Sequence, residues 1–333
     1  MIPNLDTWSS ACTGITVILC TYNRCRDLAG TLESVAASQV PSSVTWEVLV
    51  VDNNSTDQTR DVVEGFCRRH PGRFRYLFEP KAGKSYALNA GIANARGEVL
   101  AFVDDDVTVE PTWLQNLTAE LHGGEWAGTA GRILPAHGFT PPPWLPPIWF
   151  PILFAHFDLG DQPSELNRPP YGANMAFRKS AFEKHGGFRI DLGPTPNSQI
   201  RNEDTEFGRR LIKAGERLRY EPSAVVYHPL PQGRITKEYF FSWWFDYGRA
   251  MIREYGERPD MYGIPRDYLS LLRCGMEILV TALRSMFAVH PQKRFYYKCW
   301  GRRWTGQMVE LYRRSVGRKR SKAAAVREKQ SEY

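Results

Sequence analysis

The sequence predicts an α/β protein with a Rossmann-like, mostly parallel sheet flanked by helices and followed by a C-terminal helical region. Short apolar runs alternate with segments of helical periodicity through the first hundred residues, a pattern typical of parallel strands joined by right-handed crossovers. The runs are almost continuously apolar, which indicates strands covered on both faces. From about residue 236 onward the helical pattern dominates.

Each of the first three expected strands is followed by an amphipathic helix, and the fourth ends at three aspartates. The second helix is expected to begin with a capping box formed by Ser55 and Gln58. Ligands of such sheets bind outside the carboxyl ends of the strands, so a site is expected after the first and fourth strands. The expected strands are 15–20, 46–52, 74–79 and 99–104, and the helical faces are marked by Leu28, Leu32, Val35 and Ala36, by Val62, Val63 and Phe66, and by Leu88, Ile92 and Ala95.

The chain beyond residue 110 has a different character. Pro111 is expected to open a helix, and residues 127–134 read as another strand. Residues 135–157 are rich in proline and aromatic side chains, so we expect a long ordered surface excursion without helix or central strand. The last 15 residues are expected to be disordered.

Composition indicates a globular protein with a basic end. Hydrophobic residues make up 42% of the 333 residues and charged residues 24%. Residues 291–333 hold 13 Lys and Arg against 3 Asp and Glu, a net charge of +10, so the other 290 residues sum to −3. A near-neutral body without a recognition motif argues against nucleic acid as a partner.

Cysteine usage and hydropathy bear on the compartment. The six cysteines show no CxxC pair and no metal-site spacing, which favours a reducing setting. The first residues lack the pattern of a signal peptide, and no stretch of 18 uncharged apolar residues occurs. We therefore expect a cytoplasmic location without a membrane span.

Three adjacent carboxylates, Asp104, Asp105 and Asp106, follow the fourth strand. Like charges about 4 Å apart near a protein surface repel by roughly 4 kcal/mol, so a cation is expected among them. The turn after the first strand, residues 21–24, has no glycine for a dinucleotide fingerprint, and no Walker A pattern is present. Mg²⁺ or Mn²⁺ held by aspartates and a diphosphate would satisfy these features. The alternative is a solvated turn.

Three further groups carry both a functional and a structural interpretation. Thr21, Tyr22, Arg24 and Asp52 follow the first two strands, where Tyr22 can stack on a base and Asp52 can accept an N–H, or they form ordinary turns. Lys81 and Lys84 precede a helix and suit a phosphate, or they are solvated. Glu203, Asp204 and Glu206 begin another helix as a catalytic group or as favourable first-turn charges.

Together these motifs closely resemble the inverting family 2 glycosyltransferases of the GT-A fold. The resemblance runs from about residue 15 to 250 in the family's order. It implies transfer of a sugar from a nucleotide-diphosphate donor with inversion at the anomeric carbon. The motifs are CTYNR, VDNNSTD, GKSYALNAGIANARGEVLAFVDDD, GANMAFRKSAFEKHGGF and NEDTEFGRRLIKAG.

The resemblance also implies roles for single residues and regions. Residues 1–110 would form the nucleotide-sugar-binding half and 111–233 the acceptor-binding half. The resemblance becomes weak beyond these, and the residue pattern itself indicates a basic helical region over 234–333. The implied roles are nucleotide binding for Thr21, Tyr22, Arg24, Asp52, Lys84, Asp104 and Asp105, metal binding for Asp106 and His228, the donor-acceptor junction for Asn174, Met175 and Glu203, and general base for Asp204.

The expected function is that of a metal-dependent inverting hexosyltransferase of polysaccharide biosynthesis. Mn²⁺ or Mg²⁺ is the expected cofactor, the donor is expected to be UDP-linked, and the expected acceptor is a hydroxyl of a glycan or of a lipid-linked acceptor. The alternative is a nucleotidyltransferase of similar sheet type, although the turn at 21–24 lacks the glycine-rich loop which that class requires.

The basic C-terminal region, rich in Trp and Phe, is expected to dock on an anionic membrane surface, which would make the protein peripheral on the inner face of the cell membrane. Residues 291–333 are expected to carry this binding. The alternative is a helical cap packed on the catalytic domain with a solvated basic end.

Overall fold

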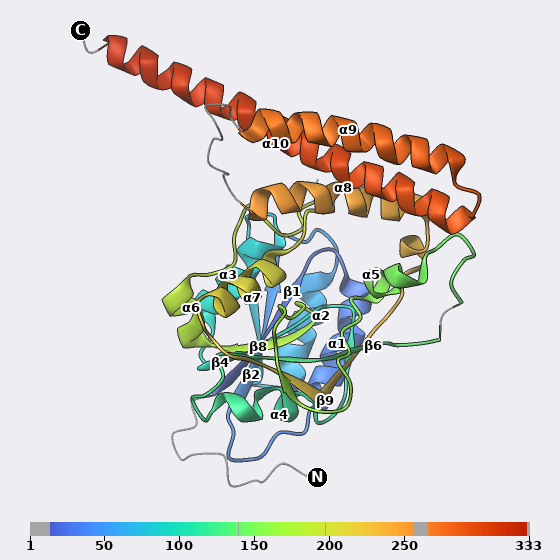
Figure 1. Cartoon of the computed structure of the whole chain (residues 1–333). Coiled ribbons are helices and arrows are strands. Elements are labelled where there is room, and N and C mark those ends of the chain that lie inside the picture. Colours follow the sequence, from blue (N-terminus) through green and yellow to red (C-terminus); the bar gives the residue numbers. More distant parts are fainter. Residues whose placement is uncertain (1–13, 139, 197, 256–265, 332–333) are drawn as a thin grey trace. The chain divides into compact units, whose positions relative to one another are not determined.

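The chain folds into two compact units, which are described separately below. The computed structural model describes the backbone of residues 14–138, 140–196, 198–255 and 266–331, and the side chains of these except 232, 266–268 and 317–331. Unit 1 comprises residues up to 140, 149–196 and 202–231, and unit 2 comprises 141–148, 197–201 and the chain from 232. Figure 1 colours the chain by residue number.

Unit 1 is built on a mixed sheet in the order β3-β2-β1-β4-β8-β6-β9-β5, with β7 paired to β9. The first four strands of that order are parallel, β8 is antiparallel to both β4 and β6, and β6 is parallel to β9. The parallel arrangement therefore holds for the first hundred residues, and the remainder is mixed. The strands are β1 (Ile15–Thr21), β2 (Trp46–Asp52), β3 (Phe74–Phe78), β4 (Val99–Val103), β5 (Thr108–Val109), β6 (Gly128–Pro135), β7 (Ser164–Glu165), β8 (Asn174–Arg178) and β9 (Leu218–His228).

Helices cover both faces of this sheet, as the apolar runs predict. Neighbouring residues of one strand point to opposite faces, so Leu19 and Val50 join one apolar cluster while Ile18 and Leu49 join the other. The first cluster packs against α1, α2 and α4, and the second against α3, α6 and α7. The helices are α1 (Cys25–Ala36), α2 (Thr59–Arg69), α3 (Lys84–Asn94), α4 (Trp113–Thr118), α5 (Phe150–Phe154), α6 (Lys179–His185) and α7 (Glu203–Lys213).

Two local predictions are wrong. The expected capping box does not form, because α2 begins at Thr59 and Asp57 Oδ1 accepts the Thr59 N–H at 3.0 Å. Ser55 instead accepts the backbone N–H of Asn23 through its hydroxyl. The excursion at 135–157 contains a 3₁₀ turn, Pro147–Trp149, and the short helix α5, in which Pro151 occupies the first turn.

The strand order has a switch point between β1 and β4. The chain continues from β1 to β2 and β3 on one side, and β4 lies on the other side of β1. Ligands of open α/β sheets bind beyond the carboxyl ends of the strands at such a switch point. The turn at 21–24 and the aspartates at 104–106 both leave the sheet there.

Unit 2 is dominated by three helices, α8 (Lys237–Glu254), α9 (Arg266–Phe287) and α10 (Pro291–Ser331). The Thr236 hydroxyl caps α8 by accepting the Tyr239 N–H. α10 packs along both α8 and α9 (Figure 1) and continues to Ser331, where a disordered end was expected. Within the described part of the chain, no helix has the length and apolar character needed to cross a membrane.

Two glycines set the close approach of α8 and α10. A Cβ atom at Gly248 would overlap the carbonyl oxygen of Arg303, and one at Gly306 would overlap that of Phe245. Side chains of Phe295, Cys299 and Leu311 are buried on the same helix α10. The first part of the basic tail is therefore a packed structural element.

We expect Gly306→Ala to lower the free energy of unfolding by about 2 kcal/mol, because the methyl group forces α8 and α10 apart. Gly275→Ala on α9 is the matched control, since a Cβ there meets nothing within 4 Å. That control should leave stability unchanged or raise it by up to about 1 kcal/mol. Urea unfolding of both variants measures the difference, and equal stabilities would contradict the proposed close contact.

Candidate active site

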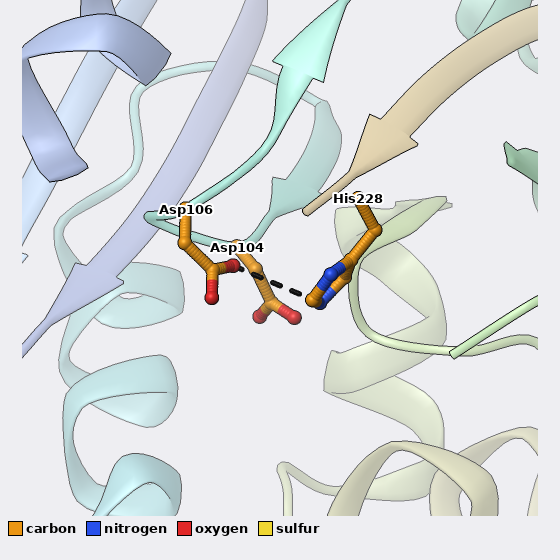
Figure 2. Close-up of side chains that lie close together, drawn as sticks. All are labelled: Asp104, Asp106 and His228. Atoms are coloured by element: carbon orange, nitrogen blue, oxygen red, sulfur yellow. Dashed lines mark ion pairs between the residues drawn. The ribbon is translucent and has the colours of Figure 1, made fainter. Parts of the chain in front are cut away.

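Asp104, Asp106 and His228 converge at the carboxyl ends of β4 and β9. Their nearest ligand atoms all lie within 4.8 Å of one another, and His228 Nε2 lies 3.7 Å from Asp106 Oδ1 (Figure 2). The two aspartates come from the turn after β4, and His228 is the last residue of β9. The three side chains point toward one another in the figure.

The hydrogen bonding of His228 leaves one ring nitrogen available as a ligand. Its Nδ1 lies 2.7 Å from the carbonyl oxygen of Pro229, and a carbonyl can only accept, so Nδ1 carries the proton. Nε2 is then the nitrogen that can serve as a ligand, and it faces Asp106. A backbone carbonyl that fixes the tautomer in this way is typical of metal-binding histidines.

Arg24, from the turn after β1, forms ion pairs with Asp105 and Asp106. Its Nη1 lies 3.1 Å from Asp105 Oδ1 and 2.5 Å from Asp106 Oδ2. Burial raises the pKa of Asp105 to about 6, and Asp106 adds to the rise while Arg24 opposes it. Asp106 therefore presents one oxygen to Arg24 and the other to His228.

Lys84 joins the aspartates to the first turn of α7. Its Nζ donates to Asp104 Oδ1 at 2.7 Å and lies 3.8 Å from Glu203 Oε1. Burial opposes ionisation of both partners, yet Lys84 lowers the pKa of Asp104 to about 2, and Asp104 and Glu203 hold the pKa of Lys84 above its ordinary value. Lys84 and Asp104 are therefore both charged.

A residue that sequence reasoning missed positions Lys84. Asn53 follows β2, and its side-chain amide accepts the Gly83 N–H at 2.7 Å and donates to the carbonyl oxygen of Lys81. The loop before α3 is fixed by these bonds, and Lys84 N donates to Pro194 O. An asparagine after a strand reads as an ordinary turn, so the sequence holds no signal for this contact.

The expected nucleoside contacts lie at or just beyond the carboxyl ends of β1 and β2. Thr21 and Asp52 are buried partners in the register of β1 and β2, and Tyr22 is 40% exposed. Asp52 accepts hydrogen bonds from the hydroxyl of Tyr76 at 2.8 Å and from Ser55 N at 2.9 Å. Its carboxylate is thus oriented at the strand end, and Tyr22 presents a ring to solvent.

Glu203 and Asp204 begin α7 with different surroundings. Burial raises the pKa of Glu203 to about 7, with Asp204 adding to the rise and Lys84 opposing it. Glu203 Oε2 is buried without a hydrogen-bond partner among the described residues. Asp204 is partly exposed and accepts the N–H groups of Gly172 at 2.7 Å and Thr205 at 2.6 Å.

Asn174 and Met175, predicted to line the donor-acceptor junction, are used by the core. The Asn174 side chain accepts from Trp113 Nε1 and donates to the carbonyl oxygens of Arg132 and Ala224, which occupies both of its N–H donors. Met175 is buried in the second apolar cluster. These contacts give both side chains structural roles, and their place at the donor-acceptor junction stays a prediction.

The three converging groups suit a divalent cation. In an octahedral ion with ligand distances of about 2.1 Å, ligand atoms lie about 3 Å apart, or about 4.2 Å when opposite. The ligand atoms of Asp104, Asp106 and His228 lie within 4.8 Å of one another, and small side-chain rotations would bring them to these distances. Two carboxylates with one imidazole favour Mn²⁺, because Mg²⁺ prefers an all-oxygen shell.

Comparison with known sequences gives consistent results. Residues 16–186 match the profile of the family described as Glycosyl transferase family 2. The succinoglycan biosynthesis protein ExoM of Rhizobium meliloti (strain 1021) is 31% identical over 223 residues, which cover 67% of this chain and 69% of that protein. A glucosyl-dolichyl phosphate glucuronosyltransferase of Haloferax volcanii is 27% identical over 72% of this chain and 77% of its own length.

Solved structures share the fold. The mannosyltransferase PcManGT from Pyrobaculum calidifontis, in complex with GDP-Man and Mn²⁺, superposes with a TM-score of 0.56 at 20% identity, covering 91% of this chain and 86% of that one. GalNAc-T7 with UDP, GalNAc and Mn²⁺ superposes with a TM-score of 0.54 at 17% identity, covering 71% of this chain and 48% of that one. The predicted GT-A fold is confirmed.

We expect Lys84→Met to lower the free energy of unfolding by about 2 kcal/mol at pH 7, because Asp104 loses the cation that depresses its pKa. A depressed carboxyl pKa stabilises the fold above the unfolded pKa, and this stabilisation is lost as the pH falls toward 2. The loss of free energy of unfolding caused by Lys84→Met should therefore be about half as large at pH 3 as at pH 7.

Lys81→Met is the matched control, since Lys81 is an exposed lysine of the same loop. Urea unfolding of the wild type and both variants at pH 7 and pH 3 provides the measurement. A deficit in Lys84→Met that is the same at both pH values would contradict the role given to Asp104.

Proposed function

The chain belongs to glycosyltransferase family 2, and we propose that it moves a hexose, with inversion, from a nucleoside-diphosphate donor to a hydroxyl of a glycan or lipid-linked acceptor. The observation that carries the proposal is the convergence of Asp104, Asp106 and His228 at the switch point of the sheet. Family membership favours sugar transfer over the nucleotidyl transfer considered from the sequence.

The donor is proposed to bind along the ends of β1, β2 and β4. Tyr22 offers a face for the base, and the oriented carboxylate of Asp52 can accept an N–H from uracil. UDP is therefore the proposed nucleotide. Residues 1–110 would then supply the nucleotide-sugar-binding half, with residues 111–233 supplying the acceptor-binding half.

Asp104, Asp106 and His228 are proposed to hold Mn²⁺ or Mg²⁺, with Mn²⁺ favoured by the imidazole ligand. When bound, the ion supplies electrostatic stabilisation to the diphosphate leaving group. Lys84 and Arg24 pair with Asp104 and Asp106 and place two positive charges beside the diphosphate. No proton donor to the leaving group is then required.

Asp204 is the proposed general base. Two backbone N–H groups orient its carboxylate, and each oxygen can accept a second hydrogen bond, here from the acceptor hydroxyl. Removal of that proton by a general base as the new bond forms typically raises the reaction rate 10²–10⁴-fold. Glu203, whose raised pKa keeps it partly protonated at neutral pH, is proposed to hydrogen-bond a hydroxyl of the donor sugar or the acceptor.

A cytoplasmic enzyme of polysaccharide biosynthesis, acting at the inner face of the cell membrane, is the proposed setting. Similarity to a protein named for succinoglycan biosynthesis and to one named as acting on a dolichyl phosphate sugar supports a glycan or lipid-linked acceptor. The basic helical region from residue 234 supports contact with an anionic membrane surface.

We expect Asp106→Asn to remove the Mn²⁺ dependence of UDP binding and to abolish sugar transfer, because one of the two carboxylate ligands is lost. Thermal unfolding with UDP, with and without Mn²⁺, measures binding, since ligand at 100 times its Kd stabilises by about 2.7 kcal/mol. Asp161→Asn, an exposed carboxylate, is the control. A variant that kept Mn²⁺-dependent stabilisation by UDP would overturn the metal assignment.

We expect Asp204→Asn to lower kcat by 10²-fold or more while the Kd for UDP changes little, because only proton removal is lost. Glu203→Gln should instead raise KM more than it lowers kcat, since the amide still forms hydrogen bonds. If Asp204→Asn kept the kcat of the wild type and Glu203→Gln lowered kcat by 10²-fold or more, the general base would be Glu203.

A further inference from the structure

α9 exposes a row of large apolar side chains. Their exposed fractions run from 46% to 79%, and the spacing of four, three, four and three residues along the main row places it on one side of the helix. The row is Leu272, Met276, Leu279, Leu283 and Met286, with Phe287 beside its end. We call these six residues the α9 apolar face.

The opposite side of α9 is buried, although the residues on it have small, mostly polar side chains. Cys274 and Thr281 are each 2% exposed, and Ser285 lies near α10 with its hydroxyl toward Arg294 O. A surface helix normally places its large apolar residues inward and its small polar ones outward. The reversed arrangement of α9 indicates that the apolar face has an occupant from outside unit 2.

Basic side chains border the α9 apolar face on both sides. Arg273 and Arg284 are exposed and eleven residues apart, so they lie on one margin of the face. On the other margin a cavity of about 550 Å³ is lined by Ala282 and Met286 of α9 and by two cations of α10, Lys298 and Arg302. Long basic side chains at such margins can reach lipid phosphates while their stems cover apolar surface.

We propose that the α9 apolar face lies in the surface of an anionic membrane, with its leucine and methionine side chains at the acyl-chain boundary and the four flanking cations at lipid phosphates. This inference rests on the proposed association with a membrane surface and names the face responsible. It is independent of the transfer chemistry, because no residue of the face belongs to the candidate active site.

A second copy of the chain fits this face less well. Antiparallel packing about Leu279 would place Arg273 of one copy beside Arg284 of the other. Parallel packing would place the arginine margin of each copy beside the other copy's opposite margin, which holds Lys298 and Arg302. Like charges held close together destabilise either arrangement. Anionic phosphates satisfy the same cations.

Removal of residues 291–333, the test suggested by charge alone, would be misleading. α10 contributes Phe295, Cys299 and Leu311 to the core of unit 2, and Glu310 pairs with Arg249 at 3.1 Å and with Arg253 at 2.8 Å. The truncation would therefore unfold unit 2. Substitutions on the exposed face of the full chain avoid this difficulty.

The first test uses the full-length triple variant Leu272→Ser, Leu279→Ser and Leu283→Ser. The probe is a phosphatidylglycerol and phosphatidylcholine vesicle in a 3:7 ratio, and the readout is the co-sedimenting fraction at low salt. We expect the partition coefficient to fall about tenfold or more, because most of the inserted apolar surface is lost. The matched control replaces two exposed isoleucines elsewhere, Ile148→Ser and Ile190→Ser, and should bind like the wild type.

The second test addresses the cations. Arg273→Glu with Arg284→Glu should lower binding to the anionic vesicles about tenfold or more, and should abolish the difference between anionic and pure phosphatidylcholine vesicles. Lys213→Glu, which changes the charge of an exposed lysine on α7, should have little effect. High salt should weaken wild-type binding.

The outcomes are distinguishable. Wild-type protein that stays in the supernatant would overturn the membrane association itself, and leucine variants that bind like the wild type would overturn only the assignment to α9. Sedimentation equilibrium that shows a wild-type dimer, converted to a monomer by the leucine variants, would assign the face to a second copy instead. Hydrolysis of UDP-sugar in solution, measured for every variant, should be unchanged and reports separately on the proposed transfer function.

Discussion

The site depends on the balance of charge between a group of carboxylates and two cations. Asp104, Asp105, Asp106 and Glu203 meet at one edge of the sheet, and their mutual repulsion would be prohibitive without Lys84 and Arg24. Lys84 links Asp104 at the end of β4 to Glu203 in the first turn of α7, so it joins segments that are distant in sequence. The hydrogen bonds of Asn53 to Lys81 and Gly83 fix the loop that directly precedes Lys84.

The sequence was most informative where the physical cause is local. Continuous apolar runs predicted β1 to β4 within one or two residues, and the aspartate run marked the site, because burial on both faces and charge repulsion act over short distances. The antiparallel pairing of β8 and the use of Asn174 in the core follow instead from contacts between distant segments. Asn174 and Glu203 were both predicted at the donor-acceptor junction. Only the fold shows that the side-chain amide of Asn174 is fully hydrogen-bonded while Glu203 keeps a buried oxygen without a partner among the described residues.

The basic tail illustrates the same limit. Its charge suggested a solvated or membrane-bound end, whereas Gly248 and Gly306 allow α10 to pack closely on α8 as a structural helix. Composition reports how many cations a segment carries and not which side chains remain exposed. The apolar surface that remains belongs to α9, whose small buried residues and large exposed ones reverse the pattern expected from hydropathy.

Charge balance also connects the resting site to the proposed complex. Asp106 gives one oxygen to Arg24 and directs the other at Nε2 of His228, whose Nδ1 is bonded to Pro229 O, so the negative charge of this group comes from Asp104 and Asp106. A divalent ion held by this group would neutralise it, and the positive charges of Arg24 and Lys84 would then be available to a diphosphate. The same two cations that make the carboxylates tolerable in the absence of ligand would thus favour a doubly anionic donor, and they would favour it only when the metal is bound. This coupling gives a physical reason for metal and nucleotide to bind together.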